Sequence, residues 1–65
     1  MKEYRIYVNN KLVNINYSVF ALGCNLSSYK SNYGEENVEV KEIDSKTKDE
    51  QLIREKREWL NSFKI

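Results

Sequence analysis

The stretch KEYRIYVNNKLVNINY, residues 2–17, decides the first half of the fold. Polar and apolar side chains alternate at period two in residues 2–8 and again in residues 11–17, which is typical of β-strands. Between the two runs stand Asn9 and Asn10, and asparagine tolerates the positive φ that a two-residue hairpin turn requires. The stretch therefore predicts a β-hairpin.

A two-residue turn also predicts the register of this hairpin. The pairs on one face are Val8 with Lys11, Ile6 with Val13 and Tyr4 with Ile15, and those on the other face are Tyr7 with Leu12, Arg5 with Asn14 and Glu3 with Asn16. Every pair of strongly apolar aliphatic residues falls on the first face, and a slip of one residue would destroy this agreement. We expect a helix to cover that face.

Residues 18–34 predict that helix. At about 100° per residue, five of its side chains fall within an arc of about 80°, as expected of a helix that lies on a sheet. They are Val19, Leu22, Leu26, Tyr29 and Tyr33. Ser18 suits the N-cap and Gly34 suits the left-handed position after the last turn. Periodicity and caps therefore outweigh the weak helix propensity of the glycine, serine and asparagine residues between them.

Two further elements follow. Residues 37–43 read NVEVKEI, in which Val38 and Val40 share one face, and they predict a third strand. The segment TKDE, residues 47–50, has the form of a capping box. It predicts a C-terminal helix over residues 47–63.

The resulting order is ββαβα, an α+β fold in one small domain over residues 1–65, with a ββαβ core over residues 1–43. A right-handed crossover through the first helix makes the third strand parallel to the second. Placing it beside the first strand gives a mixed three-stranded sheet in the order 2-1-3, with the first helix packed on one face. The C-terminal helix either packs on the domain or projects from it.

The composition argues against several kinds of site. The chain has 65 residues, one cysteine and no histidine, which excludes an intramolecular disulfide and a zinc site of the usual type. Cys24 has no histidine to activate it, which favours a packing or surface role over nucleophilic catalysis. The glycines match neither a dinucleotide fingerprint nor a phosphate loop. We therefore expect no enzymatic activity, no cofactor and no metal.

The polar start of the chain and the lack of an apolar run of about 18 residues predict neither a signal peptide nor a membrane span, and hence a cytoplasmic protein. A domain of this size buries only about 60% of the surface that its unfolded chain exposes. Small folds of this kind often depend on a disulfide, a metal or a partner. With the first two excluded, a partner surface remains.

Several motifs resemble those of a known class of proteins. KEYRIYVNNKLV (residues 2–13), the helix that closes on Tyr33 and Gly34, and ENVEVKEI (residues 36–43) are similar to small ββαβ proteins carried by phages and other mobile elements of AT-rich bacteria. These are fold motifs, so no catalytic or binding residue is transferred with them. The resemblance implies an inhibitor that acts in the host cell on a host protein, such as a CRISPR-type nuclease or another defence enzyme, either by steric occlusion or by mimicry of a nucleic acid. The even charge of the chain, +1 net, favours occlusion.

The C-terminal segment carries more large apolar side chains than attachment of one helix to a sheet requires. Together with one residue of the first helix, the candidate protein-binding residues are Phe20, Leu52, Trp59, Leu60 and Phe63. Aromatic side chains of this kind serve as interface anchors. They either bind another protein or dock within the chain, on the sheet or on the Phe20 side of the first helix. A homodimer through the C-terminal helix is a related alternative.

Nucleic-acid binding is the alternative function. Arg5, Tyr7 and Lys41 are expected on the sheet face that the first helix leaves open, where an aromatic ring beside basic groups can stack on unpaired bases. Glu3 and Glu39 share that face, and the net charge of the chain is only +1. Counterion release on binding would therefore be small, and we favour a protein partner over DNA or RNA.

Overall fold

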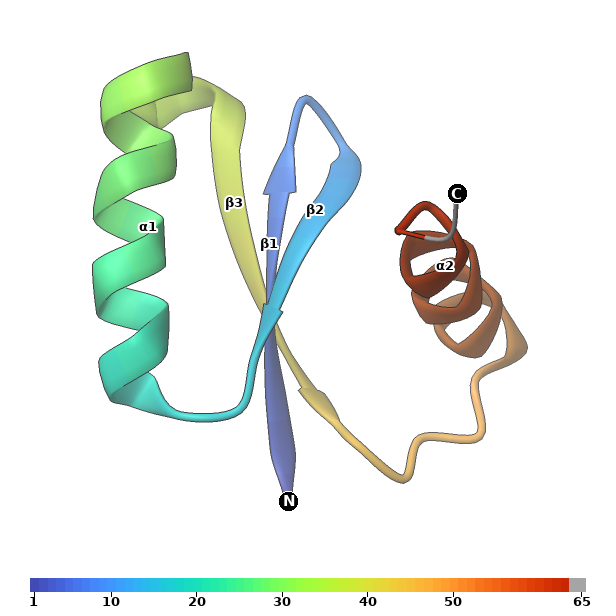
Figure 1. The fold of residues 1–65 in the computed structure, drawn as a ribbon. Helices are drawn as coiled ribbons and strands as arrows, with labels where there is room; N and C mark the ends of the chain where they lie inside the picture. Colours follow the sequence, from blue (N-terminus) through green and yellow to red (C-terminus); the bar gives the residue numbers. More distant parts are fainter. Residues whose placement is uncertain (64–65) are drawn as a thin grey trace.

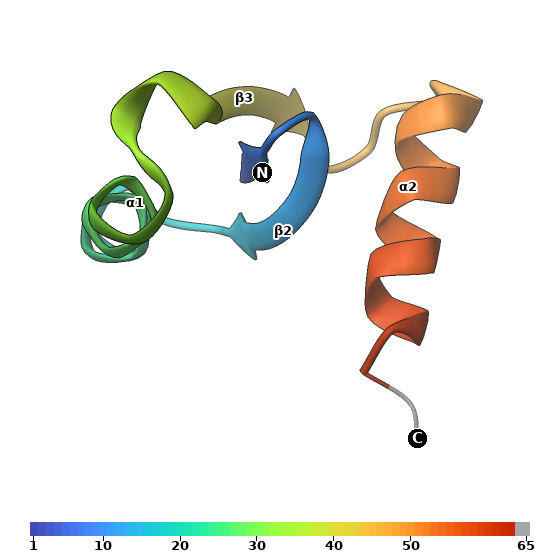
Figure 2. The same cartoon turned by 90° about the horizontal axis from the view of Figure 1, so that it is seen from above.

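A computed structural model describes residues 1–63 and has a three-stranded sheet with one helix on each face (Figure 1). The elements in chain order are β1 (Lys2–Val8), β2 (Lys11–Asn16), α1 (Val19–Tyr33), the 3₁₀ turn η1 (Glu35–Asn37), β3 (Val38–Asp44) and α2 (Glu50–Asn61). The predicted α+β class and ββαβα order are confirmed. Seen from above, α1 and α2 lie on opposite sides of the sheet (Figure 2).

The strands lie in the predicted order β2-β1-β3, with β1 in the centre. β1 pairs antiparallel with both of its neighbours. The crossover through α1 does make β3 run parallel to β2, but β1 separates the two strands. Every neighbouring pair is therefore antiparallel, so the sheet is antiparallel rather than mixed.

The hairpin turn has the two residues that the sequence predicts. Asn9 and Asn10 both adopt positive φ, at 50° and 68°, which matches the right-handed twist of the flanking strands. The backbone N–H of Asn9 also donates to the carbonyl of Asn37 at 2.9 Å. This bond ties the turn to the end of η1, where β3 begins.

A β-bulge in β2 shifts the register of the hairpin. Tyr7 lies opposite Leu12, as predicted, but the preceding residue Ile6 lies opposite Asn14. Val13 is therefore the extra residue of a bulge. The predicted pairing is right for the two pairs next to the turn and wrong beyond the bulge.

The bulge gives the sheet a second apolar face. Leu12 lies opposite Tyr7, and Ile15 lies opposite Arg5. Residues three apart in a regular strand point to opposite faces, but the extra residue brings Leu12 and Ile15 to the same one. There Tyr7, Leu12 and Ile15 are buried together. The expectation that Ile15 pairs with Tyr4, on the face of Ile6 and Val8, is therefore wrong.

α1 covers the other face of the sheet, to which β1 contributes the buried Ile6 and Val8. The helix starts after Ser18, whose Oγ accepts a hydrogen bond from the backbone N–H of Ala21 at 3.1 Å. It ends at Gly34, which has a φ of 89°. Both predicted caps are confirmed. Of the predicted stripe, the middle residues Leu22, Leu26 and Tyr29 are half-buried and the end residues Val19 and Tyr33 are exposed.

α2 begins later than the sequence predicts. The carboxylate of Asp49 accepts hydrogen bonds from two backbone N–H groups of the first turn, so Asp49 is the N-cap. Thr47 does not cap the helix, because its hydroxyl accepts a bond from the N–H of Asp49 at 3.2 Å. The predicted range 47–63 is therefore too long at both ends. The helix packs on the sheet and does not project from it (Figure 1).

Candidate protein-binding site

The central strand presents charged side chains to the face that α2 covers. Glu3, Arg5 and Tyr7 alternate along β1 on this face, and Glu3 and Arg5 are each only 1% exposed. Oε1 of Glu3 accepts hydrogen bonds from Nε and Nη2 of Arg5, at 3.1 and 2.8 Å. Because an unpaired ion is costly to bury, each charge depends on the other.

α2 completes this ion pair from its inner side. Nη1 of Arg5 donates to the backbone carbonyl of Leu52 at 3.0 Å and to Oε1 of Glu55 at 3.4 Å. The same oxygen of Glu55 accepts a hydrogen bond from the hydroxyl of Tyr7. The side chains that join β1 to α2 in this way form the interface network: Glu3, Arg5, Tyr7, Glu55 and Lys56.

The interface network shifts the pKa values of Glu3 and Tyr7. Nζ of Lys56 donates to Oε2 of Glu3. Burial raises the pKa of Glu3, but the hydrogen bonds and charges of Lys56 and Arg5 outweigh burial and hold that pKa below its ordinary value of 4.5. Burial, together with the hydrogen bond to Glu55, raises the pKa of Tyr7 to about 12. At neutral pH the carboxylate of Glu3 is therefore ionised and the phenol of Tyr7 is neutral.

An apolar contact lies beside the interface network. Trp59 of α2 packs against the cluster of Tyr7, Leu12 and Ile15. Phe63 meets the Trp59 ring edge to face, with 4.9 Å between the ring centroids, which is a favoured arrangement of two aromatic rings. Trp59 thus connects the sheet to the end of the described chain.

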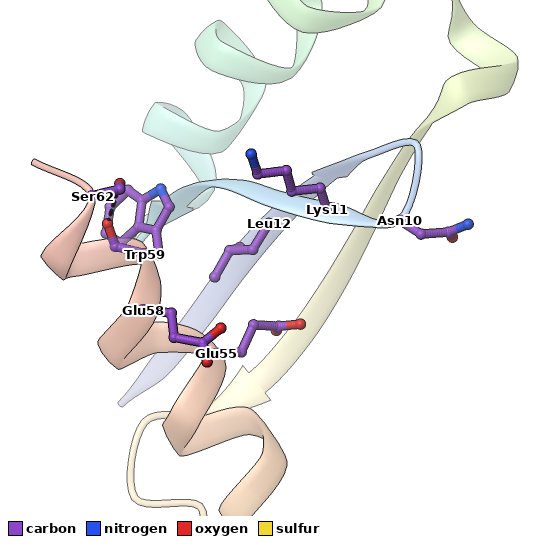
Figure 3. A pocket seen from close by; sticks show the side chains of 7 residues that line it. All are labelled: Asn10, Lys11, Leu12, Glu55, Glu58, Trp59 and Ser62. Carbon is purple, nitrogen blue, oxygen red and sulfur yellow. Dashed lines mark hydrogen bonds between the residues drawn. The ribbon is translucent and has the colours of Figure 1, made fainter.

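A pocket of about 310 Å³ opens between the hairpin turn and α2 (Figure 3). Its lining residues are Asn10, Lys11, Leu12, Glu55, Glu58, Trp59 and Ser62. Figure 3 shows Leu12 pointing from β2 towards α2, and Glu55 and Glu58 on successive turns of α2. The pocket therefore combines an apolar wall, formed by Leu12 and the indole of Trp59, with two carboxylates.

One flank of α2 carries apolar side chains that the sheet does not cover. Ile53 and Leu60 lie about 20° apart around α2, and Phe63 follows two residues after the helix ends; we call these three residues the apolar strip. Leu60 is 48% and Phe63 is 64% exposed. On the outside of the helix, Arg54 and Arg57 line a second pocket together with Ile53 and Glu50.

The structure divides the five predicted protein-binding residues into three groups. Leu52 and Trp59 lie on the inner side of α2 and are half-buried. Leu60 and Phe63 belong to the exposed apolar strip. Phe20 is 82% exposed, but it lies on α1, across the sheet from α2 (Figure 1). The expectation that Trp59 docks within the chain is met by the sheet and not by the Phe20 side of α1.

Two of the three predicted nucleic-acid contacts are buried in the structure, and the third is exposed. Arg5, Tyr7 and Lys41 do share the face that α1 leaves open, because Lys41 lies opposite Arg5. α2 covers that face, and Arg5 and Tyr7 are buried beneath it. Lys41 remains exposed, with Nζ 4.7 Å from the centre of the Tyr7 ring. The open stacking surface on which that hypothesis depends is therefore occupied.

The sequence analysis missed the residues that hold α2 in place. Glu55 and Lys56 appear as part of an ordinary charged helix surface, and Glu3 as an acid on an open face. A signal was present in β1, where Glu3, Arg5 and Tyr7 alternate on one face of the strand predicted to be central. Charged residues facing inward from a central strand require partners from another element.

Cys24 lies exposed on α1, the helix on the opposite side of the sheet from α2. Among residues 1–63, no group of three or more histidine, cysteine, aspartate or glutamate residues is placed to hold a metal ion. In the same part of the chain, no helix has the length and apolar character needed to cross a membrane.

Comparison of the chain with protein-family models, with curated proteins and with solved structures found no match in any of the three.

Proposed function

We propose that this protein is a non-enzymatic protein-binding module that acts by covering a surface of another protein. The observation that supports the proposal is the apolar strip, because Leu60 in the last turn of α2 and Phe63 just after the helix stay exposed, although the sheet already holds the inner side of α2. Attachment to the sheet needs apolar groups on one side of a helix only. Further apolar groups on its flank fit the groove of a partner.

The charges around the apolar strip indicate the chemistry of that partner. Arg54 and Arg57 are exposed next to Ile53, and within residues 1–63 neither arginine forms an ion pair. A groove with an apolar centre and carboxylates at its rim would complement this side of α2. The proposed partner surface is therefore apolar and acidic.

The proposed mode of action is steric occlusion. The resemblance to small proteins of phages and mobile elements makes the expected partner a host protein, such as a CRISPR-type nuclease or another defence enzyme. Mimicry of a nucleic acid would need a strong negative charge, whereas the net charge here is +1. Binding of DNA or RNA through Arg5 and Tyr7 would require α2 to leave the sheet, so we do not favour it.

A capture experiment with matched variants tests the proposal. The wild-type chain, the double variant Leu60→Ser/Phe63→Ser and the control Phe20→Ser are immobilised and exposed to an extract of the native host. Phe20 is the matched control because it is a large exposed apolar residue on the other helix. We expect the wild-type chain and the control to retain the same protein in comparable amounts and the double variant to lose it.

The proposal is contradicted if the double variant retains that protein as well as the wild-type chain does, or if Phe20→Ser is the variant that loses it. Sedimentation of the purified chain identifies the special case in which the partner is a second copy. A wild-type dimer that becomes a 7.8 kDa monomer on Leu60→Ser/Phe63→Ser would assign the apolar strip to self-association.

A further inference from the structure

One wall of the pocket between the hairpin turn and α2 is apolar, and another carries carboxylates. Leu12 is buried beneath it, and Trp59 contributes an indole that is only half-buried. An indole face attracts cations as well as apolar groups, because its π-electrons carry partial negative charge. One side of the pocket therefore suits a ligand with an aliphatic stem and a positively charged planar head.

The carboxylates of α2 supply the matching negative charge. Both hydrogen bonds that Glu55 accepts from Tyr7 and Arg5 end on Oε1, which leaves Oε2 for another donor. Glu58 is exposed, and within residues 1–63 it forms no ion pair. Lys11 is the only basic residue in the lining, so the two carboxylates leave the pocket with a net charge of −1.

From this combination we infer that the pocket receives an arginine side chain of the partner protein, an inference that rests on the proposed protein-binding function. The aliphatic stem lies against Leu12 and the guanidinium stacks on the Trp59 indole. The guanidinium donates to Glu58 and to Oε2 of Glu55. Trp59 also contacts Phe63 of the apolar strip, so one partner surface can reach both features.

A small probe tests this inference without the partner. The full-length chain is titrated with N-acetyl-L-arginine methylamide while the indole N–H signal of Trp59, the only tryptophan, is followed by NMR. We expect a saturable shift in the millimolar range. The neutral isostere N-acetyl-L-citrulline methylamide should bind about fivefold more weakly, as should the arginine probe to Glu58→Gln. Glu50→Gln, at an exposed acid outside this pocket, should leave binding unchanged.

Equal binding of the citrulline and arginine probes would overturn the inference, as would the lack of a saturable shift at Trp59. Equal losses in Glu58→Gln and Glu50→Gln would also overturn it, since they would reflect the overall charge and not the pocket. The single variant Leu60→Ser separates the two proposals, because Leu60 does not line the pocket: the variant should lose much of its affinity for the partner and still bind the arginine probe. Failure of the probe alone leaves the apolar strip as the binding surface.

Discussion

The two helices cover the two faces of one sheet by different means. α1 lies on a face where β1 contributes Ile6 and Val8, and its own inner residues are leucines and a tyrosine. α2 lies on a face where β1 contributes Glu3 and Arg5, both buried. The contact of α1 with the sheet is mainly apolar, whereas that of α2 consists of charged side chains beside one tryptophan.

This difference bears on how firmly each helix is positioned. Apolar burial is non-directional, so α1 is held mainly by buried area, with one side-chain hydrogen bond from Asn25 to Asn16 of β2 at 2.6 Å. Hydrogen-bonded ion pairs have strict geometry, so α2 is held in one orientation by the interface network. A buried ion pair adds little net stability over an apolar pair, but removing one partner is costly. The interface network therefore fixes which side of α2 faces outward.

Among the changes that test this difference between the helices, removing the guanidinium of Arg5 should lower the stability most. Arg5→Met leaves Glu3 buried with only Lys56 and removes the side-chain hydrogen bond to the Leu52 carbonyl. We expect the free energy of unfolding to fall by about 3 kcal/mol in chemical denaturation. Arg54→Met, a matched change on the exposed side of α2, should alter it by less than about 0.5 kcal/mol. Equal effects of the two changes would contradict the role given to the interface network.

Removing the indole of Trp59 should cause the next largest loss of stability. Trp59→Ala takes away the contact with Tyr7, Leu12 and Ile15, and because Trp59 is only half-buried we expect a loss of about 2 kcal/mol. Phe63→Ala should cost less than about 1 kcal/mol, since it removes one aromatic contact at an exposed position. Thermal unfolding of both variants measures the difference. A larger loss for Phe63→Ala would show that Phe63 is structural and weaken its role in partner binding.

Low pH should weaken the attachment of α2 to the sheet, with a smaller effect than either substitution. Because folding lowers the pKa of Glu3, its carboxylate stabilises the folded chain above pH 4.5, and this contribution is lost as the pH falls through the lower folded value. Folding raises the pKa of Tyr7, so its neutral phenol stabilises the folded chain below pH 10. This stabilisation is lost as the pH rises towards 12. Trp59 fluorescence measured against pH should show one transition in acid and one in alkali.

Glu3→Gln should remove the acid transition, and the exposed control Glu42→Gln should keep it. An acid transition that is unchanged in Glu3→Gln would belong to another group.

The parts of the fold that local chemistry controls could be predicted from the sequence. Asn9 and Asn10 predict the turn, and Ser18 and Gly34 predict the ends of α1, because each effect involves residues a few positions apart. The strand order also agrees with the prediction, which places the third strand beside the first. These predictions agree with the structure because no distant residue decides them.

The face beneath α2 could not be predicted in the same way. The bulge at Val13 turns Leu12 and Ile15 to one side, and its benefit depends on Trp59, more than forty residues further along the chain. Glu55 and Lys56 look like any charged pair of a helix until β1 supplies their partners. Of the candidate binding residues, the exposure of Leu60 and Phe63 depended on this docking and became evident only in the structure.

The most direct test of the central claim, that buried charges fix α2 on the sheet, is a set of NMR proximity measurements between the Trp59 indole and the methyl groups of Leu12 and Ile15. These contacts should be strong in the wild-type chain and weak or lost in Arg5→Met, while contacts between Leu26 and the opposite face of the sheet persist in both. Contacts of Trp59 that are missing from the wild-type chain, or that survive unchanged in Arg5→Met, would contradict the claim.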